Sequence, residues 1–291
     1  MYLLLLTSII FASANSVVLH KVKLDGSKIY KYNLIGTLVW CICLFVANRF
    51  TLTLNSDIIL WGVVYGVTQA LFILFKTQAM NTGSVSVTTL IGNCSLVVSV
   101  LACFILWGEG VGIPDILGLS VLIVGIFLTT FKKTNESYNR KWLIYSALFF
   151  VCAAGVGLTF KAFSKSASPE MAGDMMLFSS IVMLISYTII CLFTGGFKSE
   201  KEKNINKDSK DEQKLFIIYA LCSGFLSCVY NRLNIFLAGE LPGVVFYPSF
   251  NGGVVFLSMT LSILLLREKL SRKQIVGIAI GIIGICIIGV F

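Results

Sequence analysis

Ten apolar runs, each close to the length that crosses a lipid bilayer, divide the sequence. A transmembrane α-helix needs about 20 mostly apolar residues, and its backbone polar groups must be satisfied within the protein. Charged residues make up only 13% of the chain, against about 25% in a soluble domain. The sequence therefore predicts an all-α polytopic membrane protein with ten transmembrane helices. The runs lie at 2–19, 31–48, 57–76, 84–107, 113–131, 141–160, 172–195, 215–238, 243–266 and 272–291.

Two segments admit another interpretation. The first run could be a signal peptide cleaved at Ala12–Ala14, but no positive charge precedes it and cleavage would leave a very short apolar core. We therefore interpret it as the first span. The segment KSEKEKNINKDSKDEQK, residues 198–214, holds six lysines against five acids and is expected to be a solvated loop.

Glycine inside the apolar runs indicates helices that pack closely. Gly277 and Gly281 are four residues apart, the spacing that lets two membrane helices approach each other. Ser271 and Gln274, just before this glycine-bearing run, have the spacing of a capping box that starts a helix. The last run is therefore predicted to be a packed helix that begins near Ser271.

A single offset of 159 residues relates two parts of the chain. The alternative is that two glycine-bearing membrane helices look alike by chance. With a repeat, the chain divides into two five-helix halves, residues 1–131 and 141–291, joined by 132–140. An odd number of helices per half makes the repeats inverted, as in many secondary transporters. The offset connects Glu109, Gly118, Gly125, Ala79 and Ser99 with Glu268, Gly277, Gly284, Ala238 and Ser258.

The paired motifs WGEGVGIPDILGLSVLIVG and REKLSRKQIVGIAIGIIG resemble the drug/metabolite transporter superfamily, and most closely its ten-helix EamA-like members. The resemblance covers essentially the whole chain. It implies a carrier that exposes one central cavity alternately to the two sides. A lipid-linked sugar flippase or a multidrug exporter of the same superfamily is the alternative. The small multidrug exporters use a glutamate in their first helix, where this chain has Asn15 and no acid.

Basic residues indicate the orientation in the membrane. Of the 23 lysines and arginines, 19 follow odd-numbered spans and 4 follow even-numbered spans. The positive-inside rule places the odd-numbered connections in the cytoplasm and both termini outside, whereas the resemblance favours both termini inside. The expected location is the cytoplasmic membrane, and the net charge of +9 needs no nucleic-acid partner.

Polar residues inside the spans are the candidates for a substrate path, because polar groups facing lipid would be costly. They are uncharged amides, hydroxyls and phenols, which suit a neutral or zwitterionic small molecule. Such residues also serve simply to hold helices together, and the sequence leaves both roles open. The candidates are Asn15, Tyr65, Gln69, Asn93, Ser227, Asn231, Asn234, Tyr247 and Asn251.

The remaining reactive and charged residues indicate no enzyme. Arg232 lies on the opposite face of its helix from the polar residues, so we expect its side chain to reach towards the interface. Glu109 and Glu268, at turns before helices, are interpreted as structural through the helix dipole. The nine cysteines form no CxxC pair, and no metal or cofactor is expected. The hypothesis is a secondary transporter of a small organic metabolite, which could act as a monomer.

Overall fold

The computed structural model describes residues 1–22, 28–83, 85–130, 139–167, 169–194, 207–266 and 271–290. Within these ranges the chain is helical, and a 3₁₀ turn at Pro169–Met171 precedes α7. The helices are α1 (Tyr2–Lys21), α2 (Lys28–Ala47), α3 (Ser56–Thr82), α4 (Val85–Trp107), α5 (Ile113–Thr130), α6 (Arg140–Ser166), α7 (Ala172–Thr194), α8 (Lys207–Glu240), α9 (Gly243–Leu266) and α10 (Arg272–Val290).

The lengths and composition of the helices confirm an all-α polytopic membrane protein. Among the described residues, nine helices, α1 to α9, are long and apolar enough to cross a bilayer. The last helix, α10, carries no charge from Gln274 to Val290. Large apolar side chains such as Leu106 and Phe193 are exposed on the outer surface. Such a surface is stable where the surroundings are lipid.

Three helices extend by six residues or more beyond one end of the apolar runs that predicted them. α3 continues through Lys76 to Thr82, and α6 continues through Lys161 to Ser166. α8 begins at Lys207, inside the charged segment that was expected to be a loop throughout, so that expectation is wrong for its second part. Lysine, glutamate and glutamine are good helix formers, and adding residues to an existing helix is easy compared with nucleating one.

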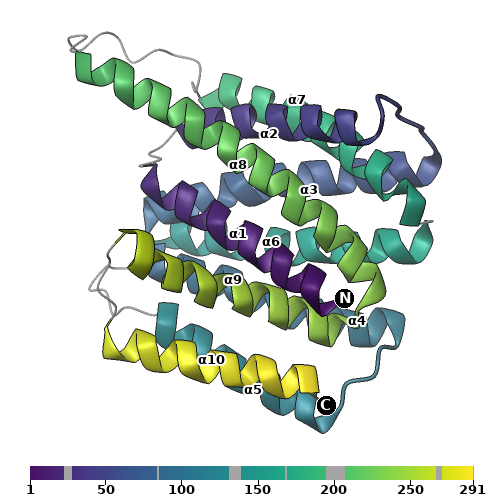
Figure 1. Cartoon of the computed structure of the whole chain (residues 1–291), viewed down its shortest axis with the longest axis vertical. Coiled ribbons are helices and arrows are strands. Elements are labelled where there is room, and N and C mark those ends of the chain that lie inside the picture. The colour runs from purple at the N-terminus through teal and green to yellow at the C-terminus, as the bar shows by residue number, and fades with distance from the viewer. Residues whose placement is uncertain are drawn as a thin grey trace.

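The helices form one bundle with a distinct pair at each end (Figure 1). α2 and α7 lie at one end of its long axis, and α5 and α10 lie at the other. Between them, α1 packs against α8 and α9, whereas α6 packs against α3 and α4. The two sets of contacts correspond. α1, α8 and α9 are each five helices away in the chain from α6, α3 and α4, in that order.

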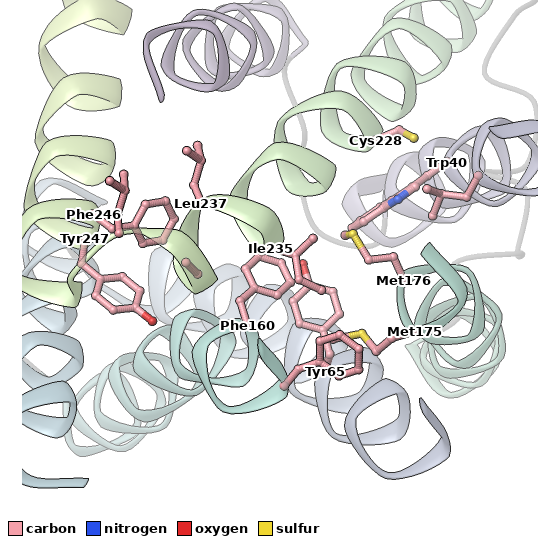
Figure 2. Close-up of a cluster of buried hydrophobic side chains, with 14 of the residues drawn as sticks. Trp40, Tyr65, Phe160, Met175, Met176, Cys228, Ile235, Leu237, Phe246 and Tyr247 are labelled. Atoms are coloured by element: carbon pink, nitrogen blue, oxygen red, sulfur yellow. The ribbon is translucent and has the colours of Figure 1, made fainter. Parts of the chain in front are cut away.

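A continuous hydrophobic core joins the middle helices to α2 and α7. Figure 2 shows Trp40, Met175 and Met176 on one side of this core, and Phe246 and Tyr247 on the other. α1 contributes Leu5 and Ile9 to the same core. The first apolar run therefore packs as a member of the bundle.

Glycine brings α5 and α10 into direct backbone contact. A Cβ at Gly125 would lie 2.6 Å from the Cα of Gly281, and one at Gly118 would lie 2.9 Å from the carbonyl oxygen of Gly284. A Cβ at Gly277 would lie 2.9 Å from the carbonyl oxygen of Gly125. These distances are too short for any side chain, so the close packing predicted from glycine spacing is confirmed.

The start of α10 also has the predicted form. The backbone N–H of Ser271 donates to Gln274 Oε1 at 2.9 Å, and the backbone N–H of Gln274 donates to Ser271 Oγ at 3.3 Å. These reciprocal bonds satisfy two donors that have no partner inside the helix. The capping box predicted from the sequence is therefore present.

The helix ends lie on two opposite faces of the bundle. α1 begins and α10 ends on the same face, which also carries the connections that follow even-numbered helices (Figure 1). We call this the even face, and the opposite one, where the odd-numbered helices end, the odd face. Of the 23 lysines and arginines, 19 follow odd-numbered spans in the sequence. The positive-inside rule therefore places the odd face in the cytoplasm.

This orientation gives a first testable prediction. In a cysteine-free background, Gly110→Cys on the even face is expected to react with an impermeant thiol reagent added to intact cells, and Arg140→Cys on the odd face is not. Both positions are exposed, so permeabilised cells provide the control in which both react. Labelling of position 140 alone would show that the even face is cytoplasmic.

Candidate substrate site

Four of the predicted site residues are joined in a hydrogen-bond network between α1, α3 and α8. Ser223 Oγ donates to Asn15 Oδ1 at 2.6 Å, and Asn15 Nδ2 donates to Ser227 Oγ at 3.3 Å. On the same face of α8, Asn231 Nδ2 donates to the carbonyl oxygen of Ser227 at 2.9 Å. Asn231 Oδ1 accepts from Tyr65 OH at 3.2 Å.

Asn234 continues this face of α8 but is paired with a different residue. Its Oδ1 accepts a hydrogen bond of 2.6 Å from Ser8 Oγ, and both side chains are buried. Tyr65 is fully buried, and its ring stacks on Phe160 of α6 with 4.8 Å between centroids (Figure 2). In this structure the network therefore fastens α1, α3 and α8 to one another.

Tyr247 and Asn251, one turn apart on α9, are also engaged. Tyr247 OH donates to the carbonyl oxygen of Gly157 in α6 at 3.0 Å. Asn251 Nδ2 donates to the carbonyl oxygen of Tyr247 at 2.9 Å, within its own helix. Tyr247 is buried, whereas Asn251 is half-buried.

Gln69 and Asn93 differ from the other predicted site residues. Gln69 Oε1 and Asn93 Nδ2 are buried atoms without a hydrogen-bond partner in the described structure, as is Ser146 Oγ of α6. Buried polar groups are nearly always hydrogen-bonded, and a missing partner costs about 1–3 kcal/mol. These three groups supply an acceptor, a donor and a hydroxyl on α3, α4 and α6.

Two aromatic residues lie one helical turn from Gln69 and Ser146, and their rings contact each other. Phe72, one turn after Gln69, contacts Phe149 of α6 with 5.2 Å between centroids. The ring of Phe149 also touches Gly92, the neighbour of Asn93, because a Cβ at Gly92 would lie 2.4 Å from the ring. Apolar and aromatic walls with a few polar groups are typical of small-molecule sites. We call Gln69, Phe72, Asn93, Ser146 and Phe149 the α3–α4–α6 cluster.

Ser146 and Phe149 were missed by sequence reasoning. The only signal was helical spacing: Trp142, Ser146 and Phe149 are all buried and lie on one face of α6. Trp142 donates from its Nε1 to Thr88 Oγ1 of α4 at 3.0 Å, which fixes this face against α4.

A buried ion pair holds the even face together. Lys161, only 1% exposed, lies five residues before the end of α6. Its Nζ lies 2.5 Å from Glu109 Oε1 and donates to the carbonyl oxygen of Leu241 at 2.9 Å. Glu109 Oε2 accepts from the backbone N–H of Gly243 at 2.5 Å. The α4–α5 connection, α6 and the α8–α9 turn are therefore joined at one point.

This arrangement corrects the interpretation of Glu109. The acid was expected to act at the helix that follows it, but it lies at the N-terminus of α9, where the first N–H groups of a helix have no partner. Lys161, one of the four basic residues counted after even-numbered spans, instead lies inside α6 and pairs with this acid. Glu268, interpreted in the same way, lies outside the described residues.

Arg232 lies apart from the polar face of α8. Its side chain is exposed, and a Cβ at Gly173, beside the start of α7, would lie 2.8 Å from its Nη1 and 2.6 Å from Asn48 Oδ1. It also lines a pocket of about 320 Å³ between α6, α7 and α8. This position agrees with a side chain that reaches towards the interface.

A second hollow of about 530 Å³ lies between α1, α9 and α10. Leu5, Ile9, Phe256 and Ile285 are among its lining residues, and the lining is almost entirely apolar. It is separate from the α3–α4–α6 cluster, and none of the nine predicted site residues lines it.

Comparison with known families decides the kind of protein. The family model described as "Sugar transport protein" matches residues 3–291. The chain belongs to this family. The sugar transport protein family is a family of membrane transporters, so the prediction of a multi-pass membrane transporter is confirmed at this level. No curated protein sequence matches the chain.

Solved structures support the fold of this sugar transport family member. A crystal structure described only as that of a protein has a TM-score of 0.71 to the chain. The likeness covers 99% of this chain and 96% of that chain, at 11% sequence identity. At this identity the likeness concerns the fold alone.

Proposed function

We propose that the protein carries a neutral, sugar-like solute across the cytoplasmic membrane and binds it at the α3–α4–α6 cluster. The observation that carries the proposal is the set of unpartnered groups Gln69 Oε1, Asn93 Nδ2 and Ser146 Oγ, on the three helices that the Phe72–Phe149 contact and the packing of Phe149 on Gly92 bring together. The match to the sugar transport protein family supports the same solute class.

The chemistry of the cluster fits a polyhydroxylated ring. A hydroxyl group is one donor with two acceptor lone pairs, so a sugar can donate to Gln69 Oε1 and accept from Asn93 Nδ2. The carbon–hydrogen face of the ring can pack on Phe72 and Phe149. Binding would satisfy groups that are unpaired without solute, and the site needs no buried charge to do so.

The other predicted site residues receive a different role in this proposal. Asn15, Ser227, Asn231 and Asn234 already have partners inside the protein. They hold α1, α3 and α8 together, and they would contact the solute only if those hydrogen bonds exchanged. Tyr247 and Asn251, which are also paired, flank the α6–α9 contact.

We further propose that residues 1–131 and 141–291 are inverted repeats joined by 132–140, and that the protein works by alternating access. The helix contacts support this division. α1 packs against α8 and α9, and the corresponding helix of the second half, α6, packs against the corresponding helices α3 and α4. The contacts of Gly118 with Gly284 and of Gly125 with Gly277 support it too, because the two pairs exchange under the 159-residue offset. Both halves lie in one chain, so a monomer would suffice.

Lipid-linked substrates remain a second candidate because of the apolar hollow between α1, α9 and α10. An acyl chain could occupy such a surface while a sugar headgroup reaches the bundle. The two candidates differ in whether a water-soluble sugar is moved. Uptake of free sugar by the purified protein in liposomes therefore separates them.

The proposed site gives a second testable prediction. Gln69→Ala and Asn93→Ala are each expected to weaken sugar binding or uptake by about tenfold or more, because a solute hydroxyl loses its partner. The unfolding temperature in detergent should not fall, since neither group has a partner to lose. Uptake of a panel of radiolabelled neutral sugars, corrected for folded protein, provides the measurement.

Asn234→Ala and Ser120→Ala are the matched controls. Asn234→Ala should lower the unfolding temperature, because the buried hydrogen bond between Ser8 Oγ of α1 and Asn234 Oδ1 of α8 is lost. Ser120, exposed on α5 and bonded to its own helix, should leave both quantities unchanged. Full uptake by both the Gln69 and Asn93 variants would contradict the location of the site.

A further inference from the structure

α3 carries a lysine on the same face as the proposed site. Lys76 lies six residues before the end of α3 and is half-buried. Val67, nine residues earlier, is exposed on the outer surface. Nine residues correspond to two and a half helical turns, so Lys76 lies opposite this lipid-facing side.

The ammonium group of Lys76 has an aromatic neighbour that belongs to the cluster. Its Nζ lies 5.7 Å from the ring centroid of Phe72, the same ring that contacts Phe149. Among the described residues, no carboxylate lies within salt-bridge distance of it, whereas the buried Lys161 of α6 is paired with Glu109. Lys76 therefore places a positive charge without a described acidic partner at the edge of the α3–α4–α6 cluster.

We propose that Lys76 is a specificity-determining residue that excludes cationic solutes from the path. A neutral sugar carries no charge for the ammonium group to repel, so it can pass Lys76. A solute with its own ammonium group would be repelled, and at the effective dielectric of a partly buried site this repulsion amounts to about tenfold or more in binding. The inference rests on the proposed function, because it names which solutes that same site rejects.

Two sugars that differ by one group test the selectivity. Glucose and glucosamine, the latter in its protonated form, are compared by uptake into liposomes that contain the purified protein. The wild type is expected to prefer glucose by about tenfold or more. Lys76→Met should bring the two sugars within about threefold of each other and should retain glucose uptake. Lys165→Met, a lysine exposed at the end of α6, should keep the wild-type ratio.

A second measurement requires no transported sugar. In a cysteine-free background, Gln69→Cys is modified with small thiol reagents, one anionic and one cationic. The anionic reagent is expected to react faster, and adding Lys76→Met should reduce that preference by about tenfold. An unchanged preference would overturn the role of Lys76. Failure of both reagents to modify position 69, together with no uptake of glucose, would instead overturn the proposed site.

Discussion

Replacing Lys161 with methionine is expected to destabilise the protein far more than the loss of an exposed charge. Removing one partner of a buried ion pair leaves an uncompensated charge and costs about 3–5 kcal/mol. Glu109 would lose its cation and Leu241 would lose a hydrogen-bond donor. The unfolding temperature in detergent should fall by more than about 5 °C.

A second variant separates the charge from the packing. In Lys161→Met with Glu109→Gln, the buried charge is removed while the Gln carbonyl can still accept from the N–H of Gly243. Replacing a whole buried ion pair by neutral groups is often nearly neutral, so the double variant should recover most of the lost stability. Lys165→Met, exposed on the same helix, should change stability by no more than about 0.5 kcal/mol. Equal stabilities of the single variant and this control would contradict the ion pair.

Gly125→Leu is expected to be the most damaging change in the apolar interior. A Cβ there would lie 2.6 Å from both the Cα and the backbone nitrogen of Gly281. Backbone atoms cannot rotate away as a side chain can, so α5 and α10 would have to separate. Overpacking a core costs about 1–3 kcal/mol and occasionally more, and this variant should reach or exceed the upper value.

Gly110→Leu is the matched control for this change. A Cβ at Gly110, in the α4–α5 connection, would have no heavy atom within 4 Å. The control variant should therefore unfold at nearly the wild-type temperature. Gly281→Ala provides an intermediate case. Its Cβ would lie 1.8 Å from the buried ring of Phe256, but that ring is a side chain and can move aside more easily than backbone. An unfolding temperature that is unchanged in Gly125→Leu would show that α5 and α10 do not pack in this way.

Local patterns in the sequence predicted much of the fold. The ten apolar runs predicted the ten helices because crossing a bilayer requires a fixed length. The spacing of Gly277 and Gly281 predicted a close helix contact, and that of Ser271 and Gln274 predicted a capping box. Each signal consists of two residues about one helical turn apart. Helix ends were less predictable: α8 starts inside a charged segment, since polar residues that favour helix can continue an apolar one.

The site depended on contacts between distant parts of the chain. Helical phase placed Gln69 and Asn234 on polar faces equally well, but only Asn234 finds a buried partner, Ser8 on α1. Glu109 was expected to act on the next helix, yet its partners are Lys161 and Gly243. No local pattern identifies such partners. A lysine directly after an apolar run, Lys161, was the one available signal, because a buried charge requires compensation.

The reciprocal glycine contacts between α5 and α10 restrict how the sequence can vary. A Cβ at Gly125 would collide with the carbonyl oxygen of Gly277, and a Cβ at Gly277 with that of Gly125. Gly118 and Gly284 are related in the same way. Two substitutions on opposite sides of such a contact push the same two helices apart. Their effects on stability should therefore not add, unlike those at distant positions. Related chains that enlarge a residue at one of these positions should therefore carry a compensating change on the other helix, and the two positions should covary.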